Sequence, residues 1–130
     1  MLGRQYVLPR PVAAALAQVF GEPADGVIVI ERSRYANLHR GMTATTRPNR
    51  ILLTINGADF VANPALLLHE YYHVLCQWRT GYLTRWRYLM ECARSGYAQN
   101  RYELEAREFA AGSVDFYLDA LREQTPQRAE

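Results

Sequence analysis

The chain has few cysteines and little net charge, unlike disulfide-rich or strongly charged proteins. It contains two cysteines, Cys76 and Cys92, which lie in separate expected helices and lack the C-x-x-C spacing of a redox or metal pair. We therefore expect both to be reduced residues of the core. Lysine is absent, and 15 arginines stand against 13 acidic residues, which gives a net charge of +2. So small a charge does not by itself indicate a nucleic-acid partner.

Long apolar runs are absent as well. No run approaches the roughly 20 residues that a membrane-spanning helix needs, and the N-terminal segment lacks the apolar stretch of a secretory signal. We expect no membrane partner and a cytoplasmic location, while export by a signal-free route would leave no mark in the sequence. The length of 130 residues, 49% of them hydrophobic, predicts a single domain over 1–130.

The hydrophobic pattern predicts an α+β fold. β-branched runs predict strands over 27–30 and 51–55, and helical periodicity predicts helices over 11–20, 64–80, 83–94 and 101–122. The polar segment 33–50 is expected to be mainly loop, with room for a short edge strand over 43–46. This order predicts a small sheet packed over the helix 64–80, with further helices at the C-terminal end and a core over about 51–122.

The most informative stretch is His69-Glu70-Tyr71-Tyr72-His73, an H-E-x-x-H pattern inside the expected helix 64–80. Two histidines four residues apart lie on one helical face and can bind one zinc ion, while the glutamate can act on a water molecule beside the metal. The pattern is typical of zinc-dependent hydrolysis of peptide bonds. The ligand types and spacing favour zinc, although nitrogen and carboxylate ligands also suit iron or manganese.

The surroundings of this pattern support a metal site. Asn63 and Pro64 form a helix start, and the helix that follows is apolar on nearly every side, so it should be buried. Ionisable side chains in a buried helix need compensation, which a divalent cation provides. The alternative is a helix whose histidines hydrogen-bond to neighbours and whose Glu70 pairs with an arginine. No arginine lies three or four residues from Glu70, which weakens that alternative.

A catalytic zinc needs a third protein ligand, and the helix 101–122 offers two candidates. Glu103 heads an apolar stripe and should face the core, whereas Glu105 lies at the edge of that stripe and is the reserve ligand. The stripe contains Ala106, Ala110, Val114, Tyr117 and Leu121. Asn100 and Glu103 also resemble a capping box, in which the glutamate reaches back to the backbone of the N-cap and binds no metal.

With these two motifs the chain resembles the gluzincin type of zinc metallopeptidase, whose ligands are two histidines and a glutamate. It is similar in particular to short bacterial metallopeptidase domains, including those of the contractile-injection-system core type, and more distantly to minimal peptidases with an E-x-x-A-N/D second motif. The resemblance covers about 51–111. It implies a minimal zincin-like fold with His69, His73 and Glu103 as zinc ligands and Glu70 as the catalytic base.

The resemblance carries further expectations. The strand 51–55 resembles the zincin edge strand, which receives an extended peptide by β-augmentation. Where the more distant relatives have Asn or Asp four residues after the glutamate ligand, this chain has Arg107, so another group must orient the histidines. A domain this small has little surface with which to hold a substrate. We therefore expect cleavage of a restricted protein or peptide substrate, or action within a larger assembly.

A tyrosine or histidine commonly stabilises the oxyanion in such sites. Tyr71, Tyr72, Tyr97 and Tyr102 lie near the two motifs in the sequence, whereas His39 lies in the polar loop and is expected at the surface.

Two other functions remain open. One is a zinc-stabilised interaction domain without catalysis, although a structural site has no use for Glu70. The other is a nucleic-acid-binding module, because arginines alternate with aromatic residues over 78–88. The small net charge disfavours the nucleic-acid alternative.

Overall fold

The computed structural model of the protein describes residues 3–33, 43–97 and 99–124. The chain has an α+β fold, as the hydrophobic pattern predicts. The elements are β1 (Arg4–Tyr6), α1 (Arg10–Phe20), β2 (Ile28–Glu31), β3 (Ala44–Arg47), β4 (Arg50–Leu53), α2 (Gly57–Val61), α3 (Pro64–Tyr72), the π-helical segment η2 (His73–Trp78), α4 (Arg85–Ser95) and α5 (Arg101–Gln124).

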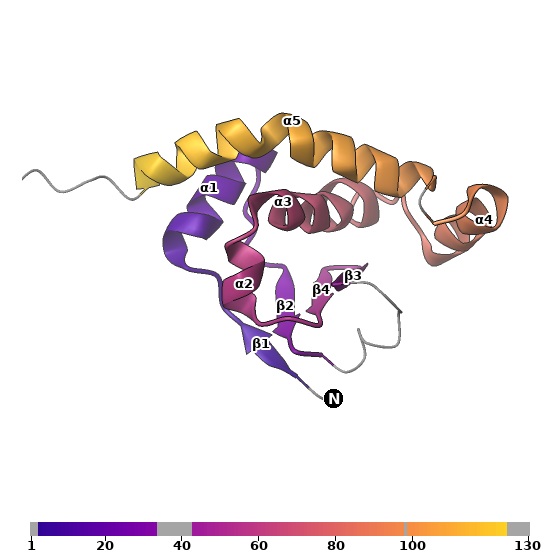
Figure 1. Cartoon of the computed structure of the whole chain (residues 1–130), viewed down its shortest axis with the longest axis horizontal. Coiled ribbons are helices and arrows are strands. Elements are labelled where there is room, and N and C mark those ends of the chain that lie inside the picture. Colours follow the sequence, from indigo (N-terminus) through magenta and orange to yellow (C-terminus); the bar gives the residue numbers. More distant parts are fainter. Residues whose placement is uncertain (1–2, 34–42, 98, 125–130) are drawn as a thin grey trace, which may run out of the picture.

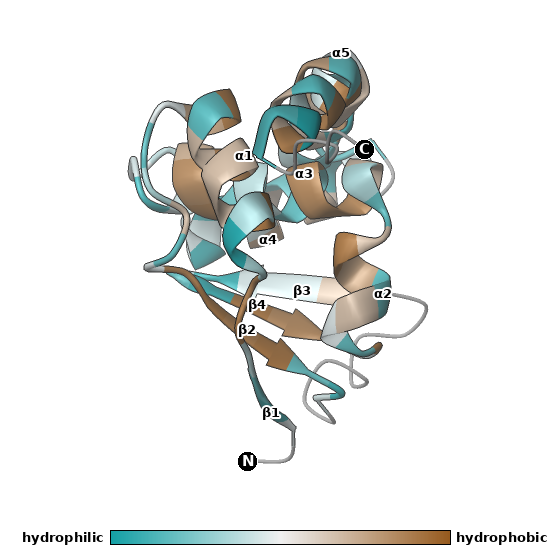
Figure 2. Cartoon of the chain, turned by 90° about the vertical axis from the view of Figure 1, so that its left-hand side faces the viewer, coloured by the Kyte–Doolittle hydropathy of each residue, from teal (hydrophilic) through white to brown (hydrophobic). Residues whose placement is uncertain are grey.

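The four strands form one mixed sheet in the order β1-β2-β4-β3. The inner strands β2 and β4 are parallel, with Val29 beside Ile51, and the outer strands pair antiparallel to them. Figure 2 shows β2 and β4 as the most hydrophobic strands of the sheet. The expectation that the strand around 51–55 lies at an edge is therefore wrong. Its apolar residues need cover on both sides, and β3 occupies the edge instead.

The helices lie on one side of the sheet in two levels (Figure 1). α3 runs between the sheet and α5, and α5 crosses above both α1 and α3. α4 projects at one end of the molecule, away from the sheet and from most of the core. This arrangement places the last residues of α3 between the edge strand β3 and the start of α5.

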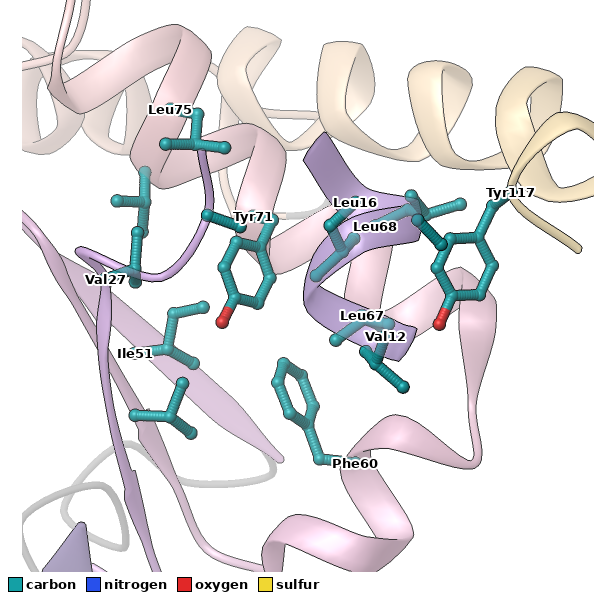
Figure 3. Packing of buried hydrophobic residues seen from close by; sticks show 14 of the residues in the cluster. Val12, Leu16, Val27, Ile51, Phe60, Leu67, Leu68, Tyr71, Leu75 and Tyr117 are labelled. Carbon is teal, nitrogen blue, oxygen red and sulfur yellow. The ribbon is translucent and has the colours of Figure 1, made fainter. Parts of the chain in front are cut away.

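The core lies between the sheet and the inner helices. Tyr71 points from α3 toward the sheet between Val27 and Ile51, and Phe60 of α2 packs below it (Figure 3). The rings of Phe60 and Tyr71 are stacked with centroids 6.4 Å apart. Leu67, Leu68 and Tyr71 are all fully buried, so the side of α3 opposite the histidines anchors the helix in the core.

Local signals in the sequence set the helix ends near the site. The Asn63 side chain accepts a hydrogen bond from the backbone N–H of Leu66, with Pro64 in the first turn of α3. The Thr84 side chain caps α4 in the same way by accepting from the backbone N–H of Arg87.

Three features differ from the elements expected from the sequence. β1 was not expected, because Arg4–Tyr6 is too short to show alternation and is ordered by pairing with β2. α2 was not expected either, and the Asn56 side chain caps it. The helix expected over 64–80 becomes π-helical at His73, where the backbone N–H of Arg79 donates to Val74 O, five residues back.

Candidate metal centre

Three candidate ligands from two helices meet at the end of α3. His69 Nε2 lies 3.0 Å from Glu103 Oε1, His73 Nε2 lies 3.2 Å from the same oxygen, and the two Nε2 atoms are 3.1 Å apart. The histidines lie on one face because they are four residues apart. α5 brings Glu103 from 34 residues along the chain. The three ligand atoms thus form a nearly equilateral triangle.

The size of this triangle fits zinc. Bonds of about 2.0–2.1 Å in tetrahedral geometry place neighbouring ligand atoms about 3.3 Å apart. The distances between the three atoms of the protein, 3.0–3.2 Å, differ from that value by only a few tenths of an ångström. A group of His69, His73 and Glu103 also leaves the fourth tetrahedral position for water or substrate. The residues present therefore fit a three-ligand zinc site, and they could hold the ion with little movement.

Gln77 determines which nitrogen of His73 is available to a metal. The Gln77 amide nitrogen donates to the backbone oxygen of Tyr102 at 3.0 Å, so the amide oxygen faces His73. That oxygen lies 2.6 Å from His73 Nδ1 and can only accept, so Nδ1 carries the proton. In the neutral ring the lone pair is therefore on Nε2, the nitrogen that lies at the triangle. Gln77 is fully buried, and its contact with Nδ1 fixes the orientation of the His73 ring.

The Glu103 carboxylate divides its two oxygens between different partners. Oε1 lies beside the two histidines, and Oε2 accepts a hydrogen bond from the hydroxyl of Tyr88 in α4 at 2.8 Å. Burial alone raises the pKa of Glu103, but the hydrogen bonds from His69, His73 and Tyr88 outweigh it and hold the pKa well below its usual range. Glu103 is therefore a carboxylate, the form that binds a cation.

The pKa of His73 is also shifted by burial and by its neighbours, but in the upward direction. Burial lowers the pKa of His73, while the hydrogen bond and charge of Glu103 outweigh burial and raise it overall. Without a metal, the negative carboxylate is compensated by the imidazoles. A bound cation would take over this compensation and displace any proton from Nε2.

Glu70 lies beside this triangle on α3 and is only 7% exposed. Burial raises the pKa of Glu70, and the charges of His73 and His69 partly oppose that rise. Among the residues that the structure describes, no arginine pairs with Glu70. The arginine pair of the non-metal alternative is thus absent from 3–33, 43–97 and 99–124. A carboxyl group whose pKa is raised accepts a proton more readily than an ordinary glutamate does.

The site opens into a cavity of about 410 Å³. Glu70, His73 and Glu103 line its floor, β3 forms one wall, and the segment from Leu83 through α4 forms the other. Trp78 connects the floor to β3, because its indole N–H donates to the Thr46 hydroxyl at 3.0 Å. A cavity of this size is typical of small-molecule or side-chain binding sites.

Glu105, the reserve ligand, lies outside the triangle. Its Oε1 accepts from the Gln77 amide at 3.3 Å, and its Oε2 accepts from the Tyr82 hydroxyl at 2.8 Å. The capping-box alternative is wrong, because Asn100 caps α5 with its own side chain through Tyr102 N while Glu103 faces the histidines. As expected, Glu103 is buried at the head of the apolar stripe of α5.

The candidate oxyanion residues have different surroundings. Tyr97 lines the cavity, and its pKa is raised first by burial and then by the charge of Glu103. Tyr71 lies in the core, Tyr72 stacks on Phe109 of α5, and Tyr102 packs against Tyr82 and Tyr88. His39 is outside the described residues. Tyr97 is the member of this set that faces the cavity.

The arginine-rich segment 78–88 is largely engaged within the fold. Arg79 donates to Glu22 at 2.8 Å and to Asn49 at 3.0 Å, and Arg87 donates to the backbone oxygens of Gly81 and Tyr82. These contacts give a structural role to two of the arginines that suggested nucleic-acid binding.

Sequence reasoning did not find Gln77 or Tyr88. A glutamine four residues after the second histidine was a usable signal, because that spacing places it on the same helical face. Tyr88 had no comparable signal, since its contact with Glu103 depends on how α4 is placed.

No family model, no curated protein and no solved structure matches the chain significantly. In the described part of the chain, none of the helices combines the length and apolar character needed to cross a bilayer.

Proposed function

We propose that the protein is a zinc-dependent metallopeptidase that cleaves a restricted polypeptide substrate. The observation that carries this proposal is the meeting of His69 Nε2, His73 Nε2 and Glu103 Oε1 beside the buried Glu70, at the floor of an open cavity. A structural zinc site usually closes with four protein ligands and does not place a carboxyl beside them. Three ligands, a free position and a neighbouring base form the arrangement that hydrolysis requires.

The chemistry divides between the metal and Glu70. A zinc ion in such a site lowers the pKa of a water molecule to about 7 and polarises a carbonyl group. Glu70 accepts the proton of the attacking water and returns it to the leaving amine as the peptide bond breaks. Gln77 keeps the tautomer of His73 fixed throughout, and Tyr88 holds the outer oxygen of Glu103.

The edge strand β3 provides a place for the substrate backbone. Among the described residues, β3 pairs only with β4, and Ala44–Arg47 line the cavity. An extended peptide can add to such an edge through its backbone, which presents a peptide bond to the site with little demand on side chains. This assigns to β3 the role that the sequence suggested for the strand over 51–55.

Metal content and hydrolysis of the Glu70→Gln variant test the proposal together. We expect about one zinc per chain in the wild type and in Glu70→Gln, measured by elemental analysis, and loss of zinc from His73→Ala and Glu103→Ala. Glu105→Ala should keep zinc, because Glu105 lies outside the triangle.

Hydrolysis is measured on a pool of random-sequence peptides, with new termini identified by mass spectrometry. The wild type should cleave, Glu70→Gln should lose about 10²- to 10⁴-fold or more in rate, and the exposed control Glu108→Gln should match the wild type. Zinc binding without cleavage in the wild type would refute a peptidase and favour a zinc-stabilised interaction domain. Absence of stoichiometric zinc would refute both.

A further inference from the structure

α4 is an amphipathic helix whose apolar side faces outward. Its inner side carries Tyr88, Glu91, Cys92 and Ser95, whereas Trp86, Leu89 and Met90 are 69%, 62% and 55% exposed. The apolar residues are spaced three and four apart, so they share one face of the helix. Exposed apolar side chains gathered in one patch mark an interaction site more often than scattered ones do. This patch of Trp86, Leu89 and Met90 is called the α4 face below.

The inner side of α4 is held by specific polar contacts, so its orientation is defined. Tyr88 donates to Glu103, the Glu91 carboxylate accepts from Arg94 and from the backbone N–H of Arg101, and the Asn100 amide lies 3.2 Å from Cys92 Sγ. Rotation of the helix to bury the apolar residues would break these contacts. The outward direction of the α4 face is therefore built into the fold.

The charge around the α4 face is positive. Its exposed ionised side chains are Arg85, Arg87 and Arg94, and its single acidic residue, Glu91, is buried against Arg94 and Arg101. The Arg85 side chain forms no hydrogen bond or ion pair within the described part of the chain. A partner that combines apolar and acidic side chains matches this surface, while a second copy of α4 would bring arginines against arginines.

The α4 face continues into the cavity of the metal centre. Leu89 and Arg85 both line that cavity, and Tyr88 between them contacts Glu103. If one segment of a polypeptide lies in the cavity beside β3, the adjacent segment would contact α4. The walls of a small domain are short, so a docking surface beside the cleft adds selectivity that the cavity alone cannot give.

We propose that the α4 face, together with Arg85, docks an acidic and apolar segment of the substrate polypeptide, next to the segment that lies in the cavity. This inference rests on the proposed peptidase function for the identity of the partner as substrate. It assigns the selection of substrates to α4 and leaves the chemistry to α3 and α5. Trp86 is the anchor, because an exposed tryptophan provides the largest apolar contact area.

Binding to zinc-loaded Glu70→Gln protein tests the proposal without turnover. The probes are three fluorescein-labelled peptide pools of equal length: one mixes Glu with Phe and Leu, one replaces each Glu by Lys, and one replaces each Phe and Leu by Ser. Fluorescence anisotropy should give an affinity for the first pool about tenfold higher than for either of the others.

Variants of the docking residues should change this preference. Trp86→Ser with Leu89→Ser should weaken binding of the acidic apolar pool about tenfold, and Arg85→Glu should weaken it while strengthening the lysine pool. The matched controls are Phe116→Ser and Arg122→Glu on α5, both exposed residues distant in sequence from α4, and they should bind as the parent does. All substituted positions are at the surface, so folding is expected to persist, and circular dichroism checks this.

Equal binding of the three pools, or an unchanged preference in the α4 variants, would overturn the docking proposal. Concentration-dependent dimerisation that the Trp86→Ser, Leu89→Ser variant abolishes would assign the face to a second copy and overturn it as well. The two proposals fail separately. Wild-type protein that binds the acidic apolar pool but cleaves no peptide refutes the peptidase, and cleavage without pool preference refutes the docking surface.

Discussion

Replacement of Gln77 tests how the site is held in position. Gln77 is fully buried, its oxygen lies 2.6 Å from His73 Nδ1, and its nitrogen donates to Tyr102 O. In Gln77→Leu both contacts are lost, so the His73 ring is free to rotate or to carry its proton on Nε2. Loss of a group that orients a metal-binding histidine typically lowers metal affinity about 10- to 100-fold, or about 1.4–2.7 kcal/mol.

Gln77→Glu separates this orienting role from a general loss of stability. The carboxylate can still accept from His73 Nδ1 but cannot donate to Tyr102 O, and it lies beside Glu105. We therefore expect Gln77→Glu to lower thermal stability yet bind zinc nearly as well as the wild type, whereas Gln77→Leu should lose both. Zinc affinity is measured by competition with a chromophoric chelator, and stability by thermal unfolding of the metal-free protein. Equal zinc affinities in Gln77→Leu and the wild type would refute the tautomer argument.

Three predictions concern the fold that supports the site. The Tyr71 hydroxyl is buried and has no hydrogen-bond partner among the described residues, so Tyr71→Phe should leave the free energy of unfolding unchanged or raise it by up to about 1 kcal/mol. A clear loss of stability in chemical denaturation would contradict this. A Cβ at Gly57 would overlap the Tyr6 ring, so Gly57→Ala should destabilise by about 1–3 kcal/mol, and a Tyr6→Ala background should relieve most of that loss in a double-mutant cycle. The pKa of Glu31 is lowered first by the hydrogen bond from the Gly57 backbone N–H and also by Arg4. The folded pKa is therefore below the unfolded value of about 4.3. Glu31 stabilises the protein above that pH, and this stabilisation is lost as the pH falls through the folded pKa. Denaturation of the wild type and Glu31→Gln should therefore differ at neutral pH and converge in acid, and a constant difference would disprove the assignment.

The parts of the site that follow from local spacing could be predicted from the sequence. His69, Glu70 and His73 are within one helical turn or little more, so their relation to one another depends only on the helix. The burial of Glu103 follows from the apolar stripe of α5, which is also a property of a single helix. The helix expected over 101–122 agrees with α5 to within two residues.

The parts that depend on how elements are placed in space could not be predicted. The order of the strands is one example: a short edge strand over 43–46 was expected and is β3, but the inner position of β4 depends on its pairing with both β2 and β3. The contact of Tyr88 with Glu103 is another, since it requires α4 to fold back toward the start of α5. The role of Gln77 combines a local spacing to His73 with a distant contact to Tyr102, and only the first of these is visible in a sequence.

The separation of His69 and Glu103 along the chain affects which helix unfolds locally first. A metal held by both residues would act as a cross-link that closes a loop of 34 residues, and all of α4 lies inside that loop. For a covalent cross-link, closing a loop of this length reduces the entropy of the unfolded chain by the equivalent of about 4 kcal/mol. When the metal leaves, α4 loses this restraint and keeps few contacts with the other elements. Amide hydrogens of α4 should then exchange with solvent before those of α3 and α5, so the state of the metal centre would be reported by the helix that we propose selects the substrate.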